Sequence, residues 1–126
     1  MTSLVLKRIY DPPDAGDGTR ILVDRLWPRG IAKDKARIDL WLKDVAPSYA
    51  LRKRFHGKPA EWEAFCAAYA AELEGAAAQA AAQELRDRLR KGPVTLLYAA
   101  RDERRNNAVA LKNWLERSRQ KKGEPS

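Results

Sequence analysis

Two short apolar runs constrain most strongly what this chain can fold into. Residues 20–24 read RILVD and residues 94–100 read VTLLYAA, and each run leads into charged residues. Strands inside a parallel sheet are covered on both faces and show continuous apolar runs rather than alternation. We therefore predict two central parallel strands. The more alternating segment SLVLKRIY (3–10) predicts a first strand ahead of them.

Helical patterns fill much of the chain between the two runs. Ser48 is the predicted N-cap of a short helix, and Pro59 is typical of the first turn of the next one. Apolar side chains then recur with helical spacing across residues 62–73. The alanine-rich residues 76–92 favour a further helix.

A last helix is predicted near the C-terminus, with Asn106 or Asn107 as its cap. Strands that alternate with helices predict an α/β domain built on a small, mostly parallel sheet flanked by helices. At 126 residues the chain is long enough for one such domain without disulfides. We expect it to span residues 1–118, followed by a flexible basic tail over residues 119–126.

Composition excludes several classes of protein. The chain has no run of 18 apolar residues, so no membrane span is expected, and its first residues lack a signal-peptide pattern. Cys66 is the only cysteine, which excludes an internal disulfide framework. A cytoplasmic protein, either monomeric or weakly dimeric, is the simplest expectation.

The distribution of charge points to an anionic partner. The formal net charge is +8, with ten Lys and Arg against four Asp over residues 20–56. Residues 57–89 are acidic, with three basic and six acidic side chains, while residues 101–126 carry eight basic and four acidic ones. Basic segments therefore flank the predicted strands, which favours phosphates, nucleic acid or acidic metabolites as partners. A merely solvated basic surface is an equally good explanation.

Polar clusters follow both apolar runs. Because the carboxyl ends of parallel strands share one edge of a sheet, which is where α/β proteins bind ligands, we expect the two clusters to meet in a cleft. The first cluster contains Asp24, Arg25, Trp27, Pro28 and Arg29, and the second contains Tyr98, Arg101, Asp102 and Asn106.

The two carboxylates are the candidate catalytic residues. Asp24 or Asp102 could act as a general acid or base, or could orient another group. Asp24 could equally well hold Arg25 or Arg101 in a structural ion pair.

The other members of the clusters are candidate ligand-binding residues. Arg25 and Arg29 could clamp a planar anion, while Trp27 or Tyr98 could flank it. The alternative is a structural role, with Trp27 in the core or at a rigid corner. Gly30 is expected to adopt a positive φ or to permit a close backbone approach.

The sequence positions of the remaining reactive side chains, His56 and Cys66, indicate structural roles. His56 follows a predicted helix end, where a capping role is a better explanation than catalysis. Cys66 lies among the apolar residues of its helix and is expected to be an inert thiol. One histidine and one cysteine form no recognisable metal-ligand spacing, so neither a metal nor a cofactor is predicted. Whether the chain is an enzyme stays open.

Three segments of the chain carry a resemblance to a known family. ILVDRLWPRG (21–30), APSYALRKRFHGKPAEWEAFCAAY (46–69) and VTLLYAARDERRNNAVALKNWL (94–115) resemble the YeaO-like branch of domain of unknown function 488. The resemblance implies a single compact, three-layer Rossmann-like α/β domain of bacterial type, and it implies no particular reaction. It covers nearly the whole chain.

The resemblance also extends the candidate site. Longer relatives end the strand that corresponds to residues 94–98 in a cysteine signature, which is absent here. Similar short members often carry a histidine where this chain has Asn107, which weakens a base role at that position. With the matching motif positions included, the candidate ligand-binding residues are Arg20, Arg25, Trp27, Arg29, Lys33, Tyr98, Arg101 and Asn106.

These observations favour three functions, in order of preference. The first is a binding cleft for a small phosphate- or carboxylate-bearing anion, with or without catalysis. The second is nucleic-acid binding through the basic surface. The third is a protein-interaction module that performs no chemistry.

Overall fold

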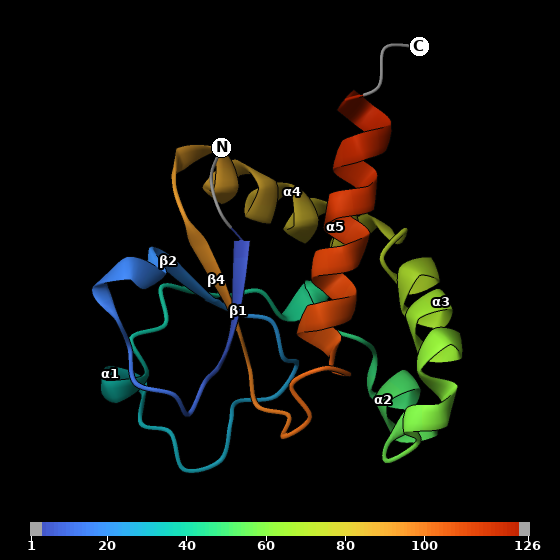
Figure 1. Ribbon diagram of the computed structural model, residues 1–126, viewed down its shortest axis with the longest axis horizontal. Coiled ribbons are helices and arrows are strands. Elements are labelled where there is room, and N and C mark those ends of the chain that lie inside the picture. The colour runs from blue at the N-terminus through green and yellow to red at the C-terminus, as the bar shows by residue number, and fades with distance from the viewer. Residues whose placement is uncertain (1–3, 124–126) are drawn as a thin grey trace.

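A four-stranded parallel sheet forms the centre of the molecule. The computed structural model describes the backbone of residues 4–123 and the side chains of residues 4–117. The strands follow the spatial order β1-β4-β2-β3, and every neighbouring pair is parallel. Figure 1 shows β1, β4 and β2. Their bounds are Leu4–Arg8 for β1, Thr19–Leu22 for β2, Leu40–Trp41 for β3 and Val94–Tyr98 for β4. The predicted parallel sheet is confirmed, and β3, with only two residues, adds a strand too short to leave a sequence pattern.

Five helices accompany the sheet. They are α1 (Lys33–Ala36), α2 (Tyr49–Phe55), α3 (Trp62–Glu72), α4 (Ala76–Lys91) and α5 (Asn107–Gly123). Ser48 caps α2 as predicted, because its hydroxyl accepts a hydrogen bond from the Leu51 N–H at 3.1 Å. Pro59 begins a single 3₁₀ turn ahead of α3, and Gly75 separates α3 from α4.

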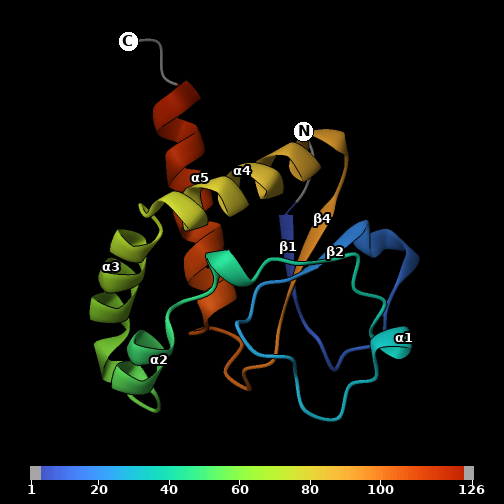
Figure 2. The same ribbon diagram turned by 180° about the vertical axis from the view of Figure 1, so that it is seen from behind.

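The two faces of the sheet are covered differently. Leu96 on β4 and Ile21 on β2 pack toward the helices α3, α4 and α5, which cover one face. Leu97 and Leu22, next to them in sequence, pack on the opposite face against Trp27 and neighbouring residues of the β2–β3 connection, which includes α1 (Figure 2). All four side chains are fully buried, which is the physical reason for the unbroken apolar runs.

The α/β fold expected from the sequence is therefore confirmed. On the second face a long connection with one short helix takes the place of a full helical layer. Helix α5 continues past residue 118 to Gly123, and residues 124–126 lie outside the described residues, so the flexible tail over residues 119–126 stays a prediction. Within the described residues, no helix combines the length and the apolar character that crossing a membrane requires.

Candidate functional site

The ends of β2 and β4 lie side by side at the carboxyl edge of the sheet. The two strands pair in parallel, and the ladder extends by one more bond from the Val23 N–H to the Leu97 carbonyl at 3.1 Å. One residue further on, the Ala99 N–H donates to Asp24 Oδ2 at 2.9 Å. The polar segments that follow the two strands are thus joined directly through the Asp24 carboxylate.

Both oxygens of Asp24 are occupied by hydrogen bonds. Asn107 donates its side-chain amide to Asp24 Oδ1 at 3.0 Å and to the Val23 carbonyl at 3.0 Å. Burial raises the pKa of Asp24, and the hydrogen bonds from Asn107 and Ala99, with the charge of Arg52, oppose this rise only in part. Asp24 therefore ties β2 to β4 and α5.

Arg25 binds backbone carbonyls and not Asp24. Its guanidinium donates from Nε to the Pro47 carbonyl at 3.1 Å and from Nη2 to the Ala46 carbonyl at 3.0 Å. These bonds hold the segment that leads into α2. Among the described residues, Arg25 forms no ion pair with a carboxylate.

Trp27 forms a packed corner on the second face of the sheet. Its indole Nε1–H donates to the Ile31 carbonyl at 2.7 Å, and its ring meets Trp41 edge to face with 5.3 Å between centroids. The Trp41 indole in turn donates to the Asp24 carbonyl at 2.6 Å. Gly30, just beyond, has φ +74°, and no atom lies within 4 Å of the position that a Cβ would take, so it serves the turn and not a close approach.

The β4–α5 loop is held by its own side chains. Asp102 Oδ1 accepts the N–H groups of Arg104 at 2.9 Å and Arg105 at 3.0 Å, and these bonds lower the pKa of Asp102. Asn106 is buried and caps α5, since its Oδ1 accepts the Val109 N–H at 2.9 Å. The loop thus presents its arginine side chains to solvent from a backbone that is fixed at both ends.

Tyr98 is the buried last residue of β4, and its hydroxyl lies beside Asn106 at the carboxyl edge. Its side chain is buried and packs with the helix-covered face of the sheet. Burial, the largest cause, raises the pKa of its hydroxyl.

Two of the candidate residues lie outside the hydrogen-bonded cluster around Asp24. Arg20 stands near the start of β2 and is 4% exposed. It donates to the Arg37 carbonyl at 3.0 Å, the Ala36 carbonyl at 3.0 Å and the Asp17 carboxylate at 2.5 Å. Lys33 is exposed on α1. The structure therefore does not bring Arg20 and Lys33 together with Asp24 and Asp102.

Several edge residues were not identified from the sequence as site candidates. Arg8, at the end of β1, donates to the Ala100 carbonyl at 3.0 Å and to the Ala99 carbonyl at 3.3 Å. Asn107 was expected only as a cap, because its partner Asp24 lies 83 residues away in the chain. The run of arginines after β4 was the one signal in the sequence for a larger basic surface.

Five arginines on this edge form neither a side-chain hydrogen bond nor an ion pair with the described residues, although Arg52 acts by its charge on Asp24, and Arg104 and Arg105 on Asp102. All five side chains are exposed. They come from the β2–α1 connection, α2 and the β4–α5 loop, which all lie at the same end of the molecule (Figure 1). We call this set the edge arginines: Arg29, Arg52, Arg101, Arg104 and Arg105.

The remaining reactive side chains are placed as follows. His56 is exposed at the C-cap position of α2, as the sequence favoured. Cys66 is half-buried on α3, and burial raises the pKa of its thiol. The described residues contain no group of three His, Cys, Asp or Glu side chains placed to hold a metal ion.

Comparison with known proteins identifies the family. The family model described as "Inactive DUF488-N3 subclade" matches residues 3–126. This chain belongs to that family. The resemblance inferred from the sequence motifs is confirmed, because the uncharacterized protein YeaO of Escherichia coli K12 is 47% identical over 109 residues, covering 86% of this chain and 93% of YeaO.

Two mycobacterial relatives match the chain over a similar length. Uncharacterized protein Mb3100c of Mycobacterium bovis and uncharacterized protein Rv3073c of Mycobacterium tuberculosis are each 41% identical over 114 residues, covering 90% of this chain and 94% of the relative. No solved structure matches the chain significantly.

Proposed function

We propose that this DUF488-N3 family member binds phosphate-bearing anions at the carboxyl edge of its sheet and does not transform them. The observation that carries the proposal is the set of edge arginines, five exposed guanidinium groups that form no side-chain hydrogen bond or ion pair with the described residues. Guanidinium groups bind phosphate and carboxylate oxygens through two parallel hydrogen bonds. The loop that supplies Arg101, Arg104 and Arg105 is held by Asp102 and Asn106, which limits the ordering cost of binding.

The absence of catalysis is argued from the two candidate carboxylates. Both oxygens of Asp24 accept hydrogen bonds from within the protein, and Asp102 caps its own loop. A general base needs a free oxygen and a pKa near the working pH. Asp24 has no free oxygen, and Asp102, whose Oδ2 accepts none of these bonds, is a weak base because its pKa is lowered. The family description "Inactive DUF488-N3 subclade" supports the same interpretation.

The arrangement of the arginines favours an extended anion over a small one. The edge arginines are all exposed, and none of them lines either of the two cavities described in the structure. An exposed row of guanidinium groups suits several phosphate groups in a row better than a single enclosed one. Nucleic acid and a soluble polyphosphate share this chemistry, and an acidic protein is the alternative partner.

Binding to two phosphate-bearing probes tests the proposal. Inorganic triphosphate and a single-stranded oligonucleotide are titrated by fluorescence anisotropy competition over a series of salt concentrations. The variant Arg101→Gln/Arg104→Gln/Arg105→Gln is expected to lose affinity by about tenfold or more, because each guanidinium contributes charge-assisted hydrogen bonds. A steep salt dependence and tighter oligonucleotide binding would identify nucleic acid as the source of the phosphates.

A matched variant controls for net charge. Arg88→Gln/Arg90→Gln/Lys91→Gln removes the same charge at the far end of α4, which leads into the start of β4. This control is expected to bind within about twofold of the wild type, since charges more than a Debye length away are screened. Equal losses in both triple variants, or no binding at low salt, would reject the carboxyl edge as the binding surface.

A further inference from the structure

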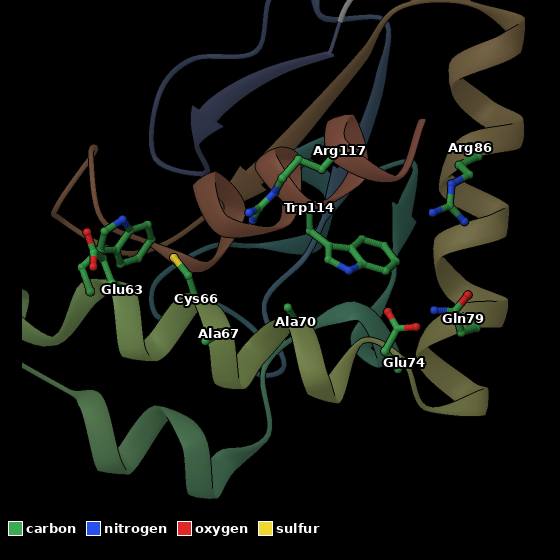
Figure 3. A pocket seen from close by; sticks show the side chains of 10 residues that line it. Glu63, Cys66, Ala67, Ala70, Glu74, Gln79, Arg86, Trp114 and Arg117 are labelled. Atoms are coloured by element: carbon green, nitrogen blue, oxygen red, sulfur yellow. The ribbon is translucent and has the colours of Figure 1, made fainter. Parts of the chain in front are cut away.

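A cavity lies in the helical layer, separate from the carboxyl edge. Helices α3, α4 and α5 line this cavity of about 700 Å³, which is open to solvent and lies in the size range of small-molecule sites (Figure 3). All three helices contribute side chains to its lining: Trp62, Glu63 and Ala70 from α3, Arg86 from α4, and Trp114 and Arg117 from α5.

Arg86 is the unusual feature of this cavity. It is 9% exposed, and its Nε–H is buried with no hydrogen-bond partner. Its guanidinium lies 5.3 Å from the centre of the Trp114 ring, and it forms no ion pair with any described residue. Buried polar groups are almost always hydrogen-bonded, and buried charges are almost always paired. The cavity also carries the carboxylates of Glu63 and Glu74, but neither forms an ion pair with Arg86. A buried arginine with an unbonded Nε–H and no ion pair therefore points to a missing anion.

The rest of the lining defines what that anion can be. Trp62, Trp114 and Ala70 provide apolar and aromatic surface, and Arg117 adds a second cation to the lining. Figure 3 shows Trp114, Ala70 and Arg117 around the cavity. Glu63 and Glu74 on the cavity wall form no ion pair with Arg86 or Arg117 among the described residues. Acidic groups on the wall disfavour a ligand with several negative charges.

We infer that this cavity binds a small organic monoanion with an aromatic or bulky apolar body. The carboxylate or sulfonate accepts hydrogen bonds from the Arg86 guanidinium, and the body packs against Trp114 and Ala70. The inference does not depend on the edge arginines, because none of them lines this cavity.

The probe for this site is 1-naphthaleneacetate, compared with its neutral analogue 1-naphthaleneacetamide. Titration of isotope-labelled protein follows the four indole N–H signals by NMR. The signals of Trp62 and Trp114 are expected to shift saturably, while those of Trp27 and Trp41, which donate to backbone carbonyls elsewhere, stay in place. The acid is expected to bind at least about tenfold more tightly than the amide, on the order of one charge-assisted hydrogen bond.

Two variants assign the effect to Arg86. Arg86→Met keeps the apolar stem and is expected to weaken binding of the acid by about tenfold while leaving amide binding unchanged. Arg90→Met makes the same substitution on an exposed residue of α4 outside the cavity and is expected to bind like the wild type. Equal affinities of acid and amide for the wild-type protein would overturn the inference, and this comparison stays decisive even if Arg86→Met fails to fold. Unchanged acid binding by a folded Arg86→Met variant, or shifts confined to Trp27 and Trp41, would also overturn it.

Discussion

The Asn107 side-chain amide donates a hydrogen bond to Asp24 Oδ1 at 3.0 Å, which connects the first residue of α5 with the residue that follows β2 and Val23. The other carboxylate oxygen accepts the Ala99 N–H, just beyond β4. One side chain therefore joins three segments at the carboxyl edge, and this makes Asp24 a structural centre of the surface that we propose for anion binding.

Replacement of Asp24 is expected to destabilise the fold. Asp24→Ala leaves the Ala99 N–H and the Asn107 amide without their acceptor, and each lost partner costs about 1–3 kcal/mol. We expect the free energy of unfolding to fall by about 3 kcal/mol in denaturant titrations. Asp34→Ala, which alters an exposed carboxylate on α1, is the control and is expected to change it by less than about 0.5 kcal/mol. A stable Asp24→Ala protein would show that the edge does not depend on this carboxylate.

Arg20 is expected to stabilise the fold and not to bind the anion. Its buried guanidinium joins β2 to Asp17 and to the carbonyls that end α1, so Arg20→Met should lower the free energy of unfolding by about 3 kcal/mol. The comparison variant Lys35→Met changes an exposed cation of α1 and should have little effect. Chemical denaturation measures both. A loss of triphosphate affinity in Arg20→Met without any loss of stability would contradict this assignment.

Asp17 is expected to stabilise the fold at neutral pH and to lose this effect in acid. Burial alone would raise the pKa of Asp17, but hydrogen bonds from the Asp14 N–H, Arg20 and Lys7 outweigh burial and hold it below the ordinary value of 3.8. The stabilisation is therefore complete above the unfolded-state pKa and is lost as the pH falls through the lower folded-state pKa. Asp17→Asn should be less stable than the wild type at pH 7, and the gap should shrink below a pH of about 3.8. Thermal unfolding midpoints across this pH range test the prediction, and a gap that stays constant with pH would count against it.

Two glycines with positive φ, Gly18 and Gly30, differ in how closely other atoms surround them. Alanine substitutions there allow the cost of a steric clash to be compared with the cost of backbone strain alone. At Gly18 (φ +65°) a Cβ would lie 2.2 Å from the Pro93 carbonyl oxygen, whereas at Gly30 (φ +74°) no atom lies within 4 Å. Gly30→Ala should therefore cost only the strain of a left-handed residue, about 1 kcal/mol. Gly18→Ala adds a clash with backbone and should cost more than about 3 kcal/mol in denaturant titrations. Similar losses at both positions would mean that the loop before β2 moves freely away from Pro93.

Local patterns were sufficient to predict most of the elements. The runs around Ile21 and Leu96 indicated strands buried on both faces, and both residues are fully buried. Ser48 and Asn106 marked helix starts because a capping side chain bonds the N–H groups that follow it within three residues. Burial periodicity and capping depend on neighbours in the chain, so the sequence alone carries them.

The candidate site could be predicted only in outline. Parallel strands imply a shared carboxyl edge, and Asp24 and Ala99 meet there. The partners of the charged groups were not predictable, because Arg25 binds a carbonyl 22 residues away and Arg8 one 92 residues away. Which acceptor a guanidinium meets depends on the path of the whole chain, and backbone carbonyls leave no signal in the residue types.

The sequence by itself determined the parallel α/β core, the positions of its helices and a basic surface beside the strand ends, because these follow from local apolar patterns and charge. Only the tertiary structure decided which charges are satisfied. It pairs Arg20 and Arg25 with the protein's own carbonyls, leaves the edge arginines in solvent, and buries Arg86 beside a cavity with its Nε–H unbonded. The physical reason is that burial and hydrogen-bond satisfaction are properties of contacts between distant segments, which exist only once the chain has folded.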